Sequence, residues 1–206
     1  MKSLNKMALI ATLVICCCAK TDVKQFIKPQ MPTVNLDEIA DGSYAAAFSV
    51  KDFNWRGSNL MLTLFSEDIY DGNQIDNIQV DDTLLFRGDT LIVKSKKMEL
   101  SFVEINGGIE HDGADLQKTN DGDYRGMQLD DHSTYSVLGK TEILLSNDFT
   151  IIDCGDEPQE PYDTIRSSQK QYLEGVKEYK KDFMELNTVV TVKNGYITNI
   201  TRRWIP

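Results

Sequence analysis

Apolar residues in this chain recur at every second position over several short runs, and this period restricts the fold more than any other feature. The clearest runs are Tyr44, Ala46, Phe48 and Val50, and then Leu60, Leu62 and Leu64. Successive side chains of a β-strand point to opposite faces, so each run predicts a strand with one face against a core. The pattern favours packed sheets over a bundle of helices.

The strongest local signal is a hairpin near the C-terminal end. Two β-prone runs, 188–193 and 196–201, flank the dipeptide Asn194-Gly195. Asn and Gly accept the positive φ angles that a two-residue type I′ turn requires. We therefore expect the two runs to pair as an antiparallel hairpin.

Further strands are expected between these regions. The runs 82–88 and 89–95 nearly repeat each other and predict another hairpin, which turns at Arg87-Gly88. Other β-prone runs cover 98–105, 135–138, 143–146 and 149–154. Strands this close together, with polar turns between them, predict a mainly β fold. We expect an antiparallel barrel or sandwich of about 8–10 strands.

One amphipathic helix is expected before the C-terminal hairpin. Asp163 or Thr164 can cap its N-terminus, and apolar residues then recur at helical spacing. They are Ile165, Tyr172, Val176, Tyr179 and Phe183, with Leu173 and Met184 on the same face. A stripe this wide is typical of a helix that packs on a sheet.

The N-terminal end has the pattern of an export signal. Lys2 and Lys6 precede an apolar stretch, 7–15, and the first acidic residue is Asp22. A charged start and a short apolar stretch are typical of a secretion signal, and the stretch is too short to span a bilayer. Three consecutive cysteines follow the stretch.

These cysteines make the segment resemble the signal of a bacterial lipoprotein, in which a cysteine becomes the lipid-modified first residue of the mature chain. The lipoprotein pattern has a branched aliphatic residue three positions before that cysteine. Cys18 fits best because Ile15 precedes it at this distance. Cys17, with Val14 upstream, is an alternative, and Cys16 is disfavoured because bulky Ile15 would precede the cut.

The layout of the chain also resembles that of small envelope lipoproteins of Bacteroidota. This resemblance implies a cell-envelope protein anchored in the membrane by lipid. Ala19-Lys20-Thr21-Asp22 lacks the acidic stretch that such bacteria use for surface export, which favours the periplasmic side. Ordinary secretion with cleavage after Ala19 is the competing hypothesis.

We expect three parts in the chain, which are a signal peptide (1–18), a flexible tether (19–35) and a single β-rich domain (36–206). The tether region mixes polar residues without periodicity, and Pro29 and Pro32 favour an extended chain. The remaining length is sufficient for one domain with a substantial core.

The charge of the chain restricts its partners. The sequence has 22 basic and 32 acidic residues and a net charge of −10. Phosphate binding needs clustered Lys or Arg, so we expect no nucleic-acid partner and no adhesion to anionic membrane surfaces. The predicted contact with the membrane is therefore the lipid, because multiple acyl chains anchor a protein without electrostatic attraction.

Three aromatic residues are the candidate ligand contacts. Phe53 and Trp55 lie in a predicted loop between early strands, and Tyr70 lies beyond the second of these strands. Loops carry many binding residues, and aromatic side chains suit a protein or glycan ligand. The competing interpretation is that Phe53 and Trp55 plug the mouth of a barrel.

The two histidines give a catalytic alternative. His111 and His132 both neighbour aspartates, so either could act as a base beside a carboxylate, or both could bind zinc with it. No metal-ligand spacing accompanies them, and both lie in predicted surface turns. We assign no catalytic residue and no resident cofactor.

Acidic turns give a calcium alternative. Asp112, Asp115, Asp121 and Asp123 place oxygen ligands near glycines. None of these turns matches the EF-hand pattern, and Asp, Asn and Gly are also common in plain turns.

The leading hypothesis is therefore a non-catalytic, lipid-anchored envelope module that binds a protein or glycan. The alternatives are a hydrolase that uses His111 or His132 and a structural, calcium-stabilised envelope protein.

Overall fold

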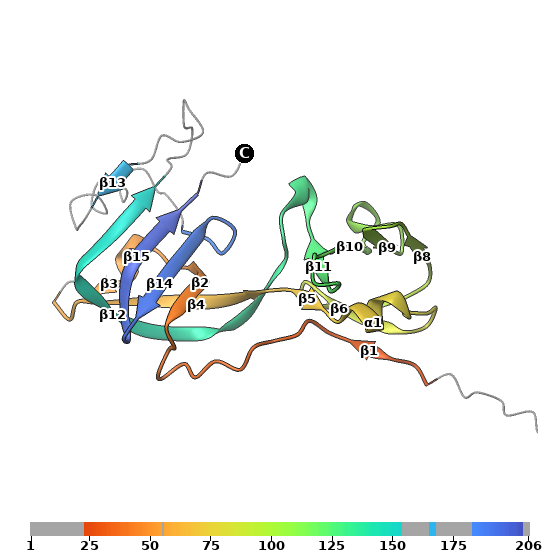
Figure 1. Ribbon diagram of the computed structural model, residues 1–206, viewed down its shortest axis with the longest axis horizontal. Coiled ribbons are helices and arrows are strands. Elements are labelled where there is room, and N and C mark those ends of the chain that lie inside the picture. The colour runs from red at the N-terminus through yellow and green to blue at the C-terminus, as the bar shows by residue number, and fades with distance from the viewer. Residues whose placement is uncertain (1–22, 55, 154–164, 168–182, 204–206) are drawn as a thin grey trace, which may run out of the picture.

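The structure is a computed structural model that describes residues 23–54, 56–153, 165–167 and 183–203. The described chain is mainly β, as predicted, with several sheets in a sandwich-like arrangement. The strands form two lobes, which lie side by side along the long axis of the molecule (Figure 1). The barrel lobe consists chiefly of β2 (Gly42–Ala47), β4 (Asn59–Glu67), β12 (Tyr135–Asp153), β14 (Thr188–Lys193) and β15 (Tyr196–Arg202).

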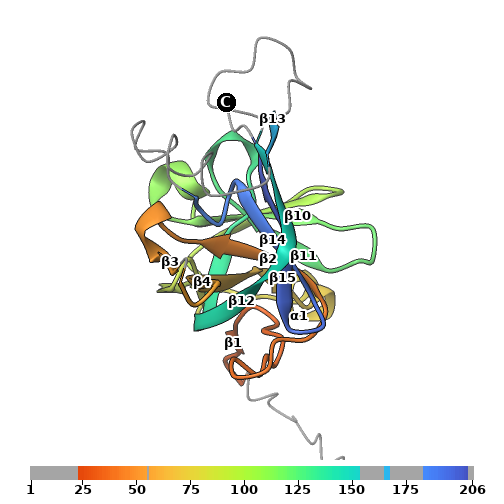
Figure 2. The same ribbon diagram turned by 90° about the vertical axis from the view of Figure 1, so that its left-hand side faces the viewer.

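Strand β12 closes the barrel lobe because it bonds to a different neighbour along each half. From Tyr135 to Leu144 it pairs antiparallel with β4, and from Leu144 to Asp153 it pairs parallel with β15. The pairs β15–β14, β14–β2 and β2–β4 complete a ring of five strands, seen from the barrel end in Figure 2. Around the ring the strands follow the order β2, β4, β12, β15 and β14. Numbered by their position in the chain, these are the first, second, third, fifth and fourth strands of the barrel, which is the strand order of an OB-fold barrel.

A glycine allows β12 to curve around the barrel. The pairing of β12 with β4 shifts register between Val137 and Gly139. Gly139 has φ +152°, and a Cβ at this position would lie 2.3 Å from Leu36 Cδ1. Any larger residue would therefore push Leu36 away from the barrel surface.

The inward side chains of the barrel lobe form the first core. Leu60, Leu62 and Leu64 of β4 are at most 1% exposed, which confirms the alternation predicted for this strand. Other members come from β2, β12, β14 and β15 and are 0% exposed, namely Ala46, Ile151, Val190, Ile197 and Ile200. The barrel therefore has a filled interior.

The second lobe, apart from β1, is inserted between β4 and β12 and packs two sheets around a core of its own. Its three-stranded sheet has the order β1 (Phe26–Ile27), β6 (Thr83–Phe86) and β7 (Asp89–Ile92). Its five-stranded sheet has the order β5 (Ile69–Tyr70), β11 (Tyr124–Met127), β10 (Ala114–Lys118), β9 (Phe102–Ile105) and β8 (Lys96–Met98). The short helix α1 (Gly72–Asp76) follows β5.

Both predicted hairpins are confirmed. Strands β14 and β15 turn at Asn194 and Gly195, whose φ angles are 52° and 77°. Strands β6 and β7 turn at Arg87 and Gly88, whose φ angles are 53° and 82°. Positive φ at both central residues matches the twist of a two-residue hairpin.

The strand count differs from the 8–10 expected. The described residues form fifteen strands, because several pairings involve only two or three residues. Two pairs, β1–β6 and β12–β15, are parallel, whereas the other strand pairs are antiparallel. The remaining short elements are β3 (Phe53–Asn54), β13 (Ile165–Ser167) and single 3-10 turns at Val50–Asp52, Ile109–His111 and Leu129–Asp131.

The predicted helix lies largely outside the described residues. At its expected start, Ile165 belongs instead to β13, which pairs antiparallel with the end of β12. A β-branched residue opposite a free strand edge accounts for this difference. At its expected end, Phe183 is buried and stacks on Phe48 with ring centroids 4.5 Å apart, whereas Met184 is 44% exposed.

Polar side chains join the two lobes where β4 and β12 leave the barrel. Ser133 Oγ donates to Glu67 Oε1 at 2.5 Å, and Ser136 Oγ donates to Asp68 Oδ1 at 2.5 Å. Asp68 is fully buried, and its backbone N–H donates to the Thr134 carbonyl at 2.9 Å. These bonds fix the two crossing segments to each other.

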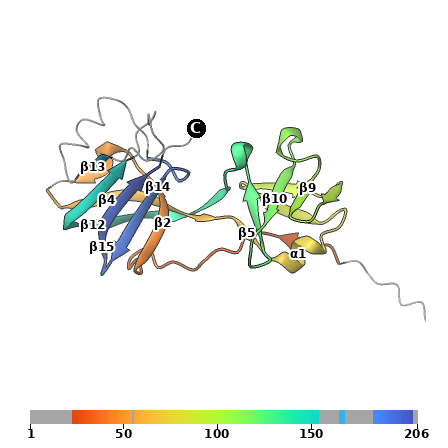
Figure 3. The same cartoon turned by 45° about the horizontal axis from the view of Figure 1, so that its top comes forward.

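Part of the region predicted as a flexible tether, 19–35, is packed against the folded protein in the described residues. Strand β1 pairs with β6, Ile27 is fully buried in the second core, and the Gln30 N–H donates to the Ile69 carbonyl at 2.6 Å. The chain then crosses to the barrel lobe, where Leu36 and Ile39 pack on the first core (Figure 3). We call residues 25–39 the N-terminal strap. The prolines keep the strap extended, and its apolar side chains attach it to both lobes.

We predict that Ile27→Ala lowers the free energy of unfolding by about 2–5 kcal/mol, because it leaves a cavity in the second core. Urea denaturation of the protein measures the change. Met31→Ala, four residues further along the strap and 42% exposed in the wild type, serves as the control and should change stability by less than about 0.5 kcal/mol. Equal, small effects of both substitutions would mean that the strap does not pack on the second lobe.

Candidate functional site

Several predicted site residues lie outside the described chain. These are the candidate lipidation residues Cys16, Cys17 and Cys18, together with Trp55. Their roles stay predictions. Within the part of the chain that the structure describes, no helix is long and apolar enough to cross a membrane.

Phe53 and Tyr70 are buried, so their aromatic rings are turned away from solvent, and a ligand contact at these residues stays a prediction. Phe53 is 7% exposed, and its ring meets Phe48 edge-on at 5.6 Å in the barrel core. Tyr70 is fully buried, and its hydroxyl donates to the Leu85 carbonyl at 2.9 Å. Burial, with the negative charge of Asp68, raises the pKa of the Tyr70 hydroxyl. Phe53 thus matches the competing interpretation of a barrel plug.

Neither histidine contacts a carboxylate within the described residues. The exposed His111 ring places Nδ1 3.0 Å from the Gly107 carbonyl oxygen, four residues earlier. The Nε2 atom of His132 is buried and has no hydrogen-bond partner in the described chain. The structure therefore does not assemble the pairs on which the hydrolase hypothesis depends, and that hypothesis stays a prediction.

The four candidate calcium ligands are not brought together. Asp112 and Asp115 lie at the start of β10, whereas Asp121 and Asp123 lie in the turn beyond its end. Among the described residues, no three His, Cys, Asp or Glu side chains are arranged to hold a metal ion. Asp112 adopts a left-handed backbone conformation (φ 56°), which suits the plain-turn interpretation. The calcium hypothesis stays a prediction.

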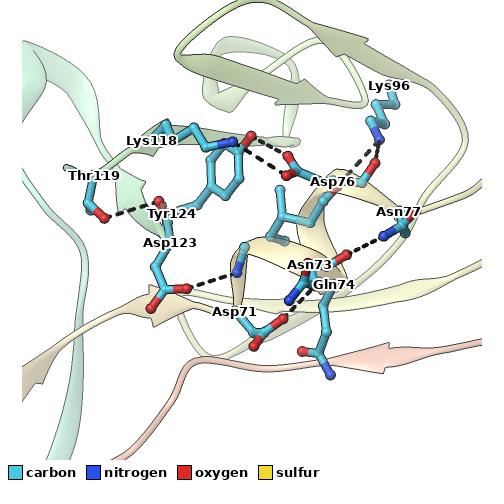
Figure 4. A network of polar contacts seen from close by, with 12 residues as sticks. Asp71, Asn73, Gln74, Asp76, Asn77, Lys96, Lys118, Thr119, Asp123 and Tyr124 are labelled. Carbon is cyan, nitrogen blue, oxygen red and sulfur yellow. Dashed lines mark hydrogen bonds and ion pairs between the residues drawn. The ribbon is translucent and has the colours of Figure 1, made fainter. Parts of the chain in front are cut away.

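Asp123 instead fixes the N-terminus of α1 (Figure 4). Its Oδ1 accepts a hydrogen bond from the Gly72 N–H at 2.9 Å, and Asp71 Oδ1 accepts one from the Gln74 N–H at 2.9 Å. A Cβ on Gly72 would lie 2.2 Å from the Gly122 carbonyl oxygen, so the close approach requires glycine. The acidic turn after β10 is thus a helix-capping device.

Lysines fix the other end of α1. Lys96 Nζ donates to the carbonyl oxygen of Asp76 at 2.9 Å (Figure 4). The Tyr124 hydroxyl donates to Asp76 Oδ1 at 2.6 Å, and Lys118 Nζ lies 3.4 Å from Asp76 Oδ2. The hydrogen bond from Tyr124, followed by the contacts with Lys118, lowers the pKa of the Asp76 carboxyl. This network holds α1 against β10 and β11, which is a structural role.

Acidic side chains do gather in a different pocket of the second lobe. This pocket has a volume of about 340 Å³, and its acidic lining residues are Glu104, Glu110, Asp115, Asp130 and Asp131. Burial, together with the negative charges of Glu104 and Glu110, raises the pKa of the Asp115 carboxyl. Of the four aspartates proposed as calcium ligands, only Asp115 belongs to this pocket.

Two of the pockets lined by described residues lie on the barrel lobe. The larger, of about 590 Å³, is lined by the acids Asp37, Glu38, Asp41 and Glu142, and by the turn of the C-terminal hairpin. Asp41 is already engaged, since its Oδ1 accepts a hydrogen bond from the Asn194 N–H at 2.6 Å. This pocket is therefore formed partly by contacts that hold the hairpin in place.

The second pocket, which we call the barrel groove, is an open hollow of about 410 Å³. It lies over the outer face of β4 and β12 and beside the connection from β2. Its lining residues are Ala47, Phe48, Ser49, Lys51, Asp52, Met61, Leu62, Thr63, Lys140, Phe183 and Met184.

Two lysines give the barrel groove its charge. Lys51 and Lys140 are both exposed, and neither forms an ion pair within the described residues. Thr63 of β4 is directly opposite Lys140 of β12 in the strand register. Asp52 is the one acid among the described lining residues, and its carboxylate Oδ2 accepts a hydrogen bond from the Ser49 N–H at 2.7 Å.

Sequence reasoning missed the barrel groove because its residues come from four separate segments. No single one of these residues stands out in the sequence. Only the pairing of β4 with β12 brings Thr63 and Lys140 together. The one available signal was the position of Thr63 on the outward side of an alternating strand. That signal identifies solvent-facing residues without showing which of them are neighbours.

No family model, no curated protein and no solved structure matches this chain. An OB-type strand order is compatible with many functions, so the function must be argued from the site itself.

We predict that Asp115→Asn stabilises the protein near pH 7, by less than about 1 kcal/mol because water screens a partly exposed carboxyl. The folded state raises the pKa of Asp115 above its usual value of 3.8, so the ionised carboxylate costs stability once the pH exceeds the folded pKa. The gain should disappear as the pH falls below 3.8.

Thermal unfolding across this pH range measures the effect. Asp112→Asn is the matched control, because Asn tolerates the left-handed conformation there and we expect no comparable gain. Destabilisation by Asp115→Asn near pH 7 that disappears below pH 3.8 would show that the negative charge is needed, as it would be for a bound cation.

Proposed function

We propose that this protein is a lipid-anchored protein of the cell envelope that binds an anionic glycan in the barrel groove, without catalysing a reaction on it. The observation that carries this proposal is the pair of lysines without ion-pair partners among the described residues, Lys51 and Lys140, beside apolar side chains in an open groove. In a chain with a net charge of −10, such a groove is locally suited to an anion.

The place of the groove on the barrel supports ligand binding. OB-fold barrels bind oligosaccharides and oligonucleotides on the face of their second and third strands. The corresponding strands here are β4 and β12, and both contribute lining residues to the barrel groove. This support is an analogy of fold, so the chemistry of the lining must select the ligand.

That chemistry favours a glycan over a nucleic acid. Two lysines can pair with carboxylate groups, whereas nucleic-acid binding needs many more cations along a phosphate backbone. The hydroxyls of Ser49 and Thr63 are near enough to the groove surface to exchange hydrogen bonds with sugar hydroxyls. Met61 and Met184 supply adaptable apolar contacts for the carbon faces of the rings.

The export signal supports the location in the envelope. A lipid on Cys18 would retain the protein at a membrane, and the residues after it favour the periplasmic side. A protein held at that surface meets the charged polymers of the envelope.

We predict that Cys18→Ser moves the protein from the membrane fraction to the soluble fraction of its native host. Intact-mass spectrometry of the wild-type protein should show acyl chains on an N-terminal residue 18. Cys17→Ser is the control and should leave both the mass of the lipid and the membrane fraction unchanged. A wild-type protein that starts at Lys20 without lipid would contradict the anchor.

We predict that Lys140→Ala and Lys51→Ala each weaken binding of a uronic-acid oligosaccharide by about tenfold, since each removes one charge-assisted hydrogen bond. Calorimetric titration of the purified protein measures the affinity. Lys193→Ala is the matched control, because Lys193 is an exposed lysine outside the groove. Equal affinity of all four proteins would exclude the barrel groove, and selective retention of a protein partner by the wild type would replace the glycan.

A further inference from the structure

We propose that the outer face of the β1–β6–β7 sheet rests on the lipid headgroups of the membrane in which the protein is anchored. This inference depends on the lipid anchor of the proposed function and does not depend on the glycan site. We call the surface the outer sheet face and define it by Phe26, Thr83 and Ile92 with the flanking lysines Lys24, Lys28 and Lys94.

The strand register brings two large apolar side chains onto this face. Phe26 is directly opposite Thr83, and Thr83 is directly opposite Ile92, so the three residues form one row across the sheet. Their neighbours Ile27 and Leu84 point to the other side and are fully buried in the second core. Phe26 is 58% exposed and Ile92 is 56% exposed, although both lie in paired strands.

Lysines surround the apolar row. Lys24 and Lys28 are each two positions from Phe26, and Lys94 is two positions from Ile92, so all three flank the row just beyond the strand ends. All three are exposed. Lys24 lies 3.3 Å from Asp81, but both side chains are more than half exposed and such a pair is weak in water. Two further acids lie near these strands, which are the buried Asp82 directly before β6 and Asp89 at the turn end of β7.

This arrangement matches the chemistry of a membrane interface. An aromatic and an aliphatic side chain can enter the region between headgroups and acyl chains, while lysines reach the phosphates. The electrostatic attraction to the headgroups comes from this local grouping of lysines alone, because the chain as a whole has a net charge of −10. The face would bind weakly by itself, but a lipid on the same chain makes the contact intramolecular and raises its effective concentration.

The position of the anchor selects this face among the surfaces of the protein. The Gln25 N–H donates to Asp82 Oδ1 at 2.8 Å, so the strap is attached to the second lobe from this residue onward. Cys18 is seven residues earlier, and seven extended residues span at most about 25 Å. An anchor at Cys18 therefore keeps the β1 side of the second lobe close to the bilayer. The barrel lobe, with its groove, is at the opposite end of the molecule (Figure 1).

Tryptophan quenching tests this orientation. The lipidated protein, purified from its host, is reconstituted into vesicles of phosphatidylcholine and phosphatidylglycerol whose acyl chains are brominated near the headgroup. The variants Phe26→Trp and Ile92→Trp report on the outer sheet face. Tyr196→Trp, in the barrel lobe and 44% exposed in the wild type, is the matched control. The emission of the parent protein is subtracted from that of each variant.

We expect bromolipid to quench the added indole at positions 26 and 92 and to leave the one at position 196 unquenched. The combined substitution Lys24→Glu, Lys28→Glu and Lys94→Glu should remove the quenching at position 26 while the protein still floats with the vesicles. Equal quenching at all three positions in a lipidated protein would overturn the contact face and leave the anchor intact. Absence of acyl mass would overturn the anchor and the contact face together. The indole at position 26 could instead change its emission with protein concentration and not with bromolipid. That result would assign the face to a second copy of the chain and overturn the membrane contact.

Discussion

The double pairing of β12 is the constraint on which the rest of the structure depends. Its first half bonds to β4 and its second half to β15, so one strand closes the ring and leaves no open edge between them. Closure encloses the first core and fixes the outward side of β4 beside that of β12. The curvature that this requires is concentrated at Gly139, where the strand register shifts and Leu36 packs closely. The barrel groove exists because these two strands are held side by side.

The second lobe follows from the same closure. Because β4 and β12 are neighbours in the barrel, the chain between them can leave and return at one place. The insertion supplies every strand of the two sheets except β1 and leaves the ring unbroken. Hydrogen bonds of Glu67 and Asp68 with Ser133 and Ser136 join the outgoing and returning segments. The N-terminal strap adds a third connection through Ile27 in one core and Ile39 in the other. The proposed anchor and the proposed ligand site are consequently at opposite ends.

Much of the fold could be predicted from residue patterns, whereas the sites could not. Alternation identified the strands around Leu60–Leu64, and Asn194-Gly195 identified the final hairpin, because both depend on neighbours in sequence. The prolines of 19–35 suggested a free tether, but Ile27 and Ile39 had partners that only tertiary packing supplies. Phe53 and Tyr70 were chosen as exposed aromatics and are buried, since a loop residue can be turned inward to fill a barrel mouth or a sheet interface. The aspartates around β10 were grouped by closeness in sequence, yet β10 separates them and Asp123 caps α1.

The sequence by itself determined the β character of the chain, its two tight hairpins and its acidic balance. Each of these depends on local conformational preference or on simple composition, which need no knowledge of distant contacts. Only the tertiary structure decided that β12 closes a barrel and that the described chain has two cores. It also decided that Lys51 and Lys140 line one groove, and that Phe26 lies in one row with Ile92. Strand register between segments far apart in the chain makes these neighbours, and a period of two leaves the choice of partner strand open.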